Sequence, residues 1–219
     1  MDFTLDTKAA KAADQTNARI TESGKYAGIL TRSEALISKK GSKGVEFSFK
    51  ADDGSSADYL SIWTHNKDGE PLSGFKTVMA MLACMSLRGA KEQTIEVEKY
   101  DFDTQQRNRV SVNGYPDMMG KPVGLLLQKE LYTKNSGGDG ERMLIVGCYR
   151  SSDEFTASEI LDKAKAPEVL AKQLAWLAGK PVKDARTANN HGVSGPSSAH
   201  RESENPGYGF GDFADDIPF

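Results

Sequence analysis

The last eight residues of this 219-residue chain combine acidic, aromatic and terminal groups that suit recognition by another protein. Asp215 and Asp216 repel each other and keep the segment extended and solvated. Pro218 restricts Ile217 to extended backbone geometry, which lowers the entropy lost when the segment docks. Phe219 offers an aromatic ring and a terminal carboxylate, which an apolar pocket edged by Arg or Lys can bind together. We therefore interpret this end as a docking peptide, since solubility alone explains the two aspartates but not the apolar cluster.

The same segment resembles the C-terminal tip of bacterial single-stranded DNA-binding proteins, which reads Met-Asp-Phe-Asp-Asp-Asp-Ile-Pro-Phe. The matching residues are Asp212, Phe213, Asp215, Asp216, Ile217, Pro218 and Phe219. Gly211 and Ala214 differ, and the second difference removes one negative charge. The resemblance implies an OB-fold core that binds the strand and a disordered linker that presents the tip to a polymerase, helicase, primase or nuclease.

The resemblance covers the tail and the general layout, not the core. Residues 1–180 form a longer core than that of the ordinary bacterial protein, with an added helical region. A phage-encoded member of the family is therefore expected, acting in DNA replication, recombination or repair in the cytoplasm of the host cell.

The segment 57–64 is predicted to be a strand that carries the stacking platform. Leu60 and Ile62 point to one side, whereas Tyr59, Ser61 and Trp63 point to the other. Single strands are held by aromatic rings that stack on bases and by cations that follow the phosphates. The predicted DNA-binding residues are Tyr59, Trp63, Lys39, Lys40, Lys43 and Arg32. Two alternatives stay open: the rings can pack under a helix, and the lysines can belong to an ordinary solvated turn.

The elements that must position these residues have a mainly β pattern. Strands are predicted at 25–38, 45–51, 57–64, 94–100, 109–113, 123–133 and 143–150. A helix is predicted at 72–87 and a second helical region at 156–178, broken near Pro167. Phe47 and Phe49 alternate with polar residues and are predicted to face the core. This inventory predicts an OB-fold-like barrel with one mid-chain helix, an additional C-terminal helical region and a disordered acidic tail.

Four segments follow from this pattern. Residues 1–20 are predicted to be a flexible N-terminal segment, and 21–182 an OB-fold-like domain that binds single-stranded DNA. Residues 183–211 are rich in Asn, Ser, Gly and Pro and bury too little apolar surface to fold, which predicts a disordered linker. Residues 212–219 form the acidic partner-binding tip.

The charge of the chain is divided unevenly between body and tail. The net charge is −3, but residues 202–219 contain five acidic residues and no Lys or Arg. The remaining chain therefore has two more basic than acidic residues, which fits a binder whose cations gather on one face. Cys84 and Cys148 lie in apolar runs and are predicted to be buried thiols. No signal peptide or membrane-spanning run is visible, so we expect a cytoplasmic protein without a membrane partner.

Catalytic motifs are weak, and we expect no enzyme activity, cofactor or metal. Gly120-Lys121 is followed by Pro122 where a phosphate-binding loop needs Ser or Thr. The acidic pairs Asp52-Asp53 and Asp101/Asp103 leave a Mg²⁺-dependent nuclease as an alternative. A single-strand annealing or recombination protein is a second alternative, and a scaffold that only mimics the tip is a third. The expected partners are single-stranded DNA and replication or repair proteins, with homo-oligomerisation left open.

Overall fold

The computed structural model describes residues 4, 7, 18–101, 105–134 and 136–186. The predicted partner-binding tip at 212–219, and the predicted linker from residue 187 onward, lie outside the described residues. The predicted flexible segment at 1–20 also lies mostly outside them.

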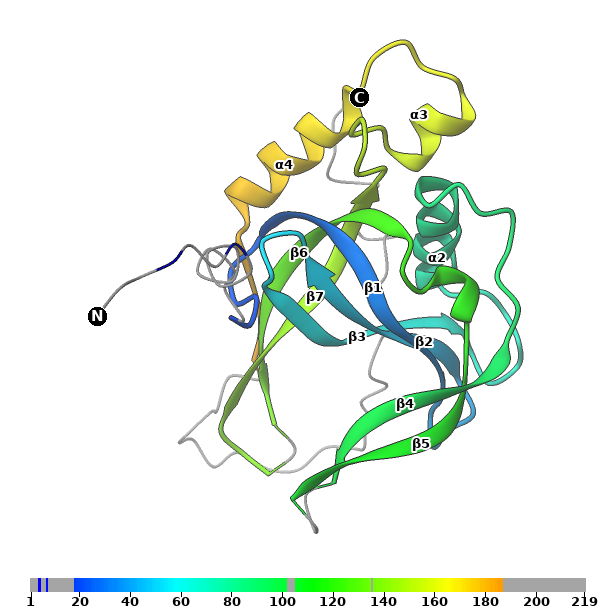
Figure 1. The fold of residues 1–219 in the computed structure, drawn as a ribbon. Coiled ribbons are helices and arrows are strands. Elements are labelled where there is room, and N and C mark those ends of the chain that lie inside the picture. The colour runs from blue at the N-terminus through cyan, green and yellow to red at the C-terminus, as the bar shows by residue number, and fades with distance from the viewer. Residues whose placement is uncertain (1–3, 5–6, 8–17, 102–104, 135, 187–219) are drawn as a thin grey trace.

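The described chain is mainly β, as predicted (Figure 1). In chain order its elements are β1 (Gly24–Ile37), β2 (Lys43–Ala51), β3 (Ser56–His65), α2 (Ser73–Cys84), β4 (Gln93–Asp101), β5 (Gln106–Gly114), a 3-10 turn (Pro116–Met118), β6 (Pro122–Thr133), β7 (Asp139–Tyr149), α3 (Ala157–Leu161), α4 (Val169–Gly179) and β8 (Val182–Ala185). Each strand and helix predicted from the sequence is confirmed, with ends that shift by a few residues.

One long strand, β1, organises the sheet. Its first part pairs antiparallel with β6, and most of its length pairs antiparallel with β2. β3 continues the sheet beyond β2, and β7 continues it beyond β6. Cα atoms of β3 and β7 come within 8 Å of each other, so the sheet curves round into a barrel-like shape. The β4–β5 hairpin joins the far part of β1 through the pair Glu34–Gly114 and projects away from the barrel (Figure 1).

The core lies inside this curved sheet and follows the predicted alternation. Phe47 and Phe49 are almost completely buried, as are Leu60 and Ile62 on the neighbouring strand. Helix α2 packs against β3 and β7 and adds the fully buried Met81. The period-two pattern of β2 and β3 therefore assigned the inner face of the barrel correctly.

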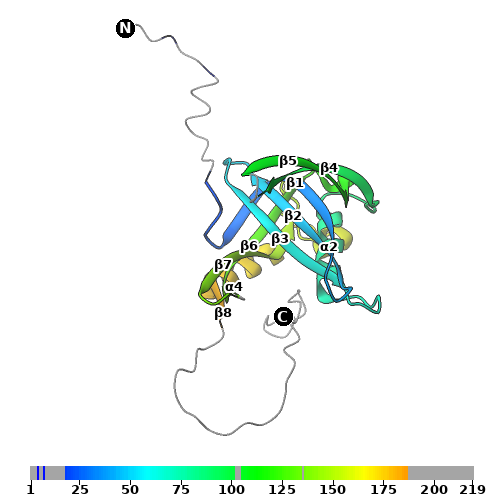
Figure 2. The same cartoon turned by 90° about the horizontal axis from the view of Figure 1, so that it is seen from below.

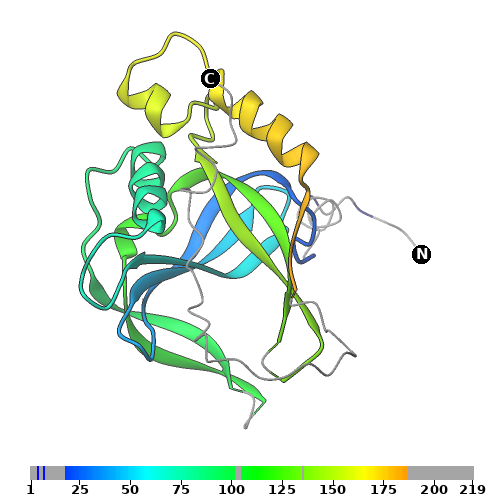
Figure 3. The same ribbon diagram turned by 180° about the vertical axis from the view of Figure 1, so that it is seen from behind.

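A second, smaller core lies on the outer side of β6 and β7, under α4. Leu126, Val146 and Tyr149 from the strands pack with Leu170 and Leu177 from the helix. Strand β6 is thus buried on both faces, which explains its nearly continuous apolar run. Figure 3 shows α4 lying beside the barrel and leading into β8, which lies next to the β6–β7 hairpin.

The C-terminal helical region is two helices, and the predicted break near Pro167 is confirmed. A capping box starts the first of them: the Thr156 N–H donates to Glu159 Oε2 at 2.8 Å. The other oxygen of Glu159 accepts the backbone N–H groups of Glu168 and Val169, which start α4. Burial raises the pKa of Glu159, but these hydrogen bonds outweigh it and lower that pKa to about 2. One carboxylate therefore fixes both helices.

The folded region extends beyond both predicted boundaries, at residues 21 and 182. Ile20 is buried in the main core, and Arg19 bridges to Ser56 at the start of β3. At the other end, β8 pairs parallel with β6 from Val182 to Ala185, three residues into the predicted linker. The sequence pattern missed both segments because each is short and is held by distant strands rather than by a local periodicity.

Candidate nucleic-acid interface

A groove with a volume of about 730 Å³ lies on the outer face of β1, β2 and β3. The three strands form its floor, and β4 supplies Glu96, Val97, Glu98 and Lys99 as a wall. Figure 2 shows the β4–β5 hairpin running beside this part of the barrel. The groove is thus bounded by elements that are far apart in the sequence and are brought together by the pairing of β1 with β5.

Strand register orders the side chains of the floor in rows that cross the strands. Glu34 pairs with Glu46, and Glu46 pairs with Ser61. In the next row, Leu36 pairs with Gly44 and Gly44 pairs with Trp63. Because residues two apart in a strand share a face, Trp63 lies on the same outer face as the groove. The predicted common face of Tyr59, Ser61 and Trp63 agrees with this register.

Tyr59 projects from a β-bulge at the edge of the groove. Phe47 pairs with Leu60 and Phe49 with Ala57, so two residues of β3 oppose one residue of β2. Tyr59 has a φ of 60°, a left-handed conformation that costs energy in a bulky residue, and its side chain is 64% exposed. Bulges of this kind redirect side chains at functional sites. Tyr59 is therefore not packed under a helix, and its ring is accessible.

Arg32 supports the Tyr59 ring from one side. Its guanidinium lies 5.7 Å from the ring centroid, within the range of a cation–π contact. The same group binds Glu46 at 2.6 Å and Glu34 at 3.2 Å, and its Nε donates to Ser48 Oγ. Because these partners already engage a half-buried guanidinium, Arg32 is held below the ring rather than extended toward solvent. The structure places this predicted phosphate contact inside the floor of the groove.

The groove is acidic in sum, which the sequence pattern did not predict. Its charged lining residues are Arg32, Lys99, Glu34, Glu46, Asp58, Glu96 and Glu98. Lys99 binds the buried carboxylate of Glu34 at 2.6 Å, and Ser61 donates to Glu46. The cations Arg32 and Lys99 offset the two carboxylates of the floor, which leaves the acidic residues of the rim. The wall residues were missed because no local pattern links β4 to β1.

Trp63 is half-buried and lies over Gly44. A Cβ on Gly44 would lie 2.9 Å from Trp63 Cε3, so the ring requires glycine at this position. The ring thus covers the floor one row beyond Glu46, and Trp63 is not among the residues that line the groove. Tyr59 is the more accessible of the two predicted stacking residues.

Lys39, Lys40 and Lys43 lie at the β1–β2 turn, directly beyond this row, and all three are exposed. The Ser42 N–H donates to Ser38 Oγ, which fixes the turn. Within the described ranges, no ion pair engages these three lysines. The turn therefore presents uncompensated positive charge at the end of the groove floor.

No protein-family model matches this chain, and no curated protein sequence matches it. The described helices include none that is long and apolar enough to cross a membrane.

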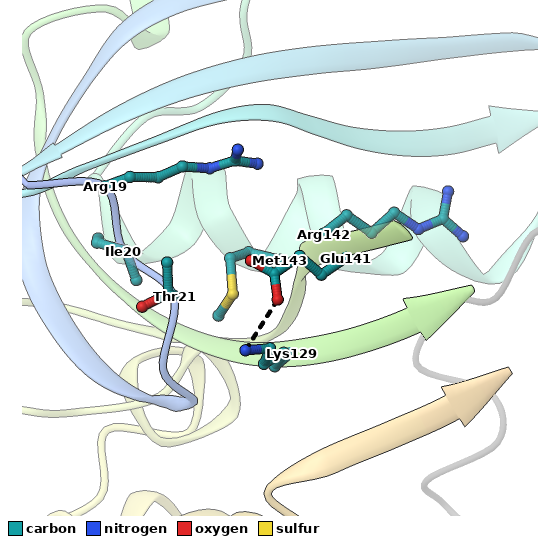
Figure 4. Close-up of a pocket in the computed structure, with 7 residues that line it drawn as sticks. All are labelled: Arg19, Ile20, Thr21, Lys129, Glu141, Arg142 and Met143. Carbon is teal, nitrogen blue, oxygen red and sulfur yellow. Dashed lines mark ion pairs between the residues drawn. The ribbon is translucent and has the colours of Figure 1, made fainter. Parts of the chain in front are cut away.

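A second tyrosine–arginine pair lies on the β6–β7 hairpin. The Arg142 guanidinium lies 5.2 Å from the Tyr132 ring, and its Nε donates to the buried carboxylate of Glu130 at 2.5 Å. The cavity beside it has a volume of only about 10 Å³, enough for one water molecule. Figure 4 shows Lys129 and Glu141 facing each other across this cavity, where they form an ion pair at 3.0 Å. The space is too small for a nucleotide.

Acidic and thiol groups elsewhere have structural contacts. Asp53 accepts hydrogen bonds from the Ser55 N–H and hydroxyl, which lower the pKa of Asp53 and close the β2–β3 turn. Asp103, part of the other acidic pair, lies outside the described residues. Cys84 and Cys148 are buried free thiols, as predicted, with sulfur atoms 3.8 Å apart. In the described part of the chain, no three His, Cys, Asp or Glu residues are grouped to hold a metal ion.

Proposed function

We propose that this protein binds single-stranded DNA without chemistry and recruits replication or repair proteins through its C-terminal tip. The observation that carries the proposal is the C-terminal sequence Asp-Phe-Ala-Asp-Asp-Ile-Pro-Phe at 212–219, which matches the family tip at seven positions. An extended acidic segment with a terminal phenylalanine suits a pocket edged by basic residues on a polymerase, helicase, primase or nuclease.

The connectivity of the barrel supports an OB-type fold for the DNA-binding part. In our proposal, β1, β2, β3, β6 and β7 are the five barrel strands, and α2 is the helix between the third and fourth of them. β1 pairs with both β2 and β6, as a closed five-stranded barrel requires. The β4–β5 hairpin is then an insertion that borders the binding face.

The exposed ring of Tyr59 supports the location of the strand. An aromatic side chain held in a strained conformation, with one face on Arg32, leaves its other face for a base. Trp63 extends the same face toward the lysine turn. We propose that bases enter the acidic groove while phosphates lie outside it, against Lys39, Lys40 and Lys43. This arrangement keeps the polyanionic backbone away from the carboxylates of the rim.

A phage-encoded protein that acts in the host cytoplasm fits this function, because a phage protein that carries the tip can recruit the host replication proteins that recognise it. We propose a binder rather than a nuclease. The reason is that Asp53, one of the candidate metal ligands, is used within its own turn.

The experiment is a gel shift with single-stranded DNA, duplex DNA and RNA, using the full chain and a chain that lacks 212–219. We expect binding to single strands, steep weakening with salt and no degradation of labelled DNA in Mg²⁺. Removal of the tip should leave DNA affinity equal or higher and abolish capture of partner proteins. A full chain that ignores single strands, or that degrades them, would refute the proposed function.

A further inference from the structure

The charged lining of the groove is unusual for a surface that binds a polyanion. Five of its charged lining residues are acidic and two are basic, and both basic groups are occupied by Glu34 and Glu46. Phosphates are repelled by such a surface. A nucleic acid that enters this groove must therefore present something other than its backbone.

Two rim carboxylates are available to a ligand. Asp58 precedes Tyr59 on the bulge, and Glu96 lines the groove at the β4 wall; both residues are exposed. No hydrogen bond or ion pair with another described residue engages either carboxylate. An ionised carboxylate can only accept hydrogen bonds. Both residues line a groove of about 730 Å³, which is large enough for a nucleotide.

The edges of the four bases differ in what they offer to a carboxylate. Cytosine, adenine and guanine each carry an exocyclic amino group that donates, and an acidic side chain accepts from such a group. Thymine has no amino group, and its single N3–H donor lies between two carbonyl oxygens, which a carboxylate repels. In an unpaired strand these edges are free while the ring stacks on an aromatic side chain.

We propose that this groove binds unpaired bases by their amino edges and prefers the amino-bearing bases, cytosine among them, to thymine, with Asp58 beside Tyr59 and Glu96 on the β4 wall as acceptors. This inference rests on the proposed function and names its base preference. The floor contributes indirectly, because Glu34 and Glu46 hold Arg32 under the ring and so fix the stacking plane.

The test compares oligo-dC with oligo-dT of equal length, by fluorescence anisotropy with the full chain at slightly alkaline pH, where cytosine is unprotonated. We expect oligo-dC to bind at least about fivefold more tightly than oligo-dT. Asp58→Asn should bring the two affinities close together, because an amide both donates and accepts. Glu96→Gln should reduce the preference in the same direction and serves as the second variant if Asp58→Asn does not fold.

Asp162→Asn is the matched control, since it removes one exposed carboxylate at the end of α3, outside the groove. It should keep the wild-type preference. Equal affinities of the wild-type chain for the two oligonucleotides, or tighter binding of oligo-dT, would overturn the inference and leave the proposed function standing. Failure to bind either one would overturn both.

An oligolysine peptide supplies the remaining arm of the test. We expect the peptide to bind only weakly and in a salt-sensitive way, and oligo-dC to displace it. A peptide that bound tightly, lost affinity in Asp58→Asn and resisted displacement by oligo-dC would show that the groove receives a cationic protein segment, and the inference would be wrong.

Discussion

Two surfaces of this barrel carry the same arrangement of a carboxylate, an arginine and a tyrosine. On the floor of the groove, Glu34 binds Arg32, and Arg32 lies 5.7 Å from the centroid of the Tyr59 ring. We call these three residues the groove trio. A lysine from another strand, Lys99, completes the pairing of the buried carboxylate at 2.6 Å.

The hairpin trio on β6 and β7 repeats this chemistry. Glu130 binds Arg142 at 2.5 Å, and the Arg142 guanidinium lies 5.2 Å from the centroid of the Tyr132 ring. Lys183 from β8 again adds a second cation, at 3.3 Å. Charge, residue type and distance are therefore nearly equal in the two trios.

The backbone makes the difference between them. Tyr59 lies at a bulge with positive φ and is 64% exposed beside a large groove, whereas Tyr132 lies in a regular strand pair and is half-buried over Gly140. Sheet irregularity, not the local charges, thus decides whether the tyrosine is presented or packed. We expect only the groove trio to bind DNA.

The largest expected effect comes from removing the two rings in turn. Tyr59→Ala should weaken binding of a mixed-sequence single strand by about 1–3 kcal/mol, because one stacked base is lost. Tyr132→Ala, the matched control, should leave affinity unchanged. Anisotropy titrations of both variants, with thermal melts to establish folding, measure this difference. Equal losses would show that the two trios are functionally alike.

Gly140→Ala tests whether exposure alone makes a platform. The new Cβ would lie 2.6 Å from Tyr132 Cζ, so the ring must swing outward. We expect the free energy of unfolding, measured by urea denaturation, to fall by about 1 kcal/mol, near the lower end of the usual range for overpacking. DNA affinity should not increase. A clear gain would mean that an exposed tyrosine on this hairpin suffices, and that the groove is not special.

Trp63→Ala extends the comparison along the groove floor. We expect oligo-dT binding to weaken several-fold, roughly 1 kcal/mol, since the half-buried ring offers less area than Tyr59. Binding is detected through a label on the oligonucleotide, because the substitution itself changes the tryptophan fluorescence of the protein. Unchanged affinity in a folded variant would remove Trp63 from the site.

The smallest expected effect concerns the support beneath each ring. Arg32→Lys keeps the charge but loses the planar contacts with Glu34, Glu46 and the ring. We expect a loss of about 0.5–1 kcal/mol in DNA affinity, because Tyr59 is less firmly held. Arg142→Lys is the matched change in the hairpin trio and should not alter affinity. If Arg142→Lys weakened binding as much as Arg32→Lys, the effect would not be specific to the groove, and the proposed support of Tyr59 by Arg32 would be wrong.

Local sequence pattern was sufficient for the inner face of the barrel and for the helices and strands other than β8. The alternation around Phe47 and Phe49, and around Leu60 and Ile62, depends only on which side of a strand each residue occupies. The bulge also left a signal: Ala57 and Leu60 are both buried but lie three residues apart, which breaks the period of two.

The acidic character of the groove was beyond the reach of sequence pattern. Glu96 and Lys99 belong to a hairpin whose position is set by one long-range pair, Glu34 with Gly114. The same limit explains why Arg32 was expected to contact phosphate, since its two carboxylate partners are identified only by strand register. Long-range register therefore separates what could be predicted from what could not.

The most direct test of the central claim is photocrosslinking of the full chain to a single strand that contains 5-iodocytosine, followed by mapping of the adducts by mass spectrometry. Our account predicts adducts at Tyr59 and Trp63, on the outer face of β1–β3, and a lower yield when unlabelled single strand competes. Adducts confined to Tyr132 on the β6–β7 hairpin, or no specific adduct at all, would contradict it.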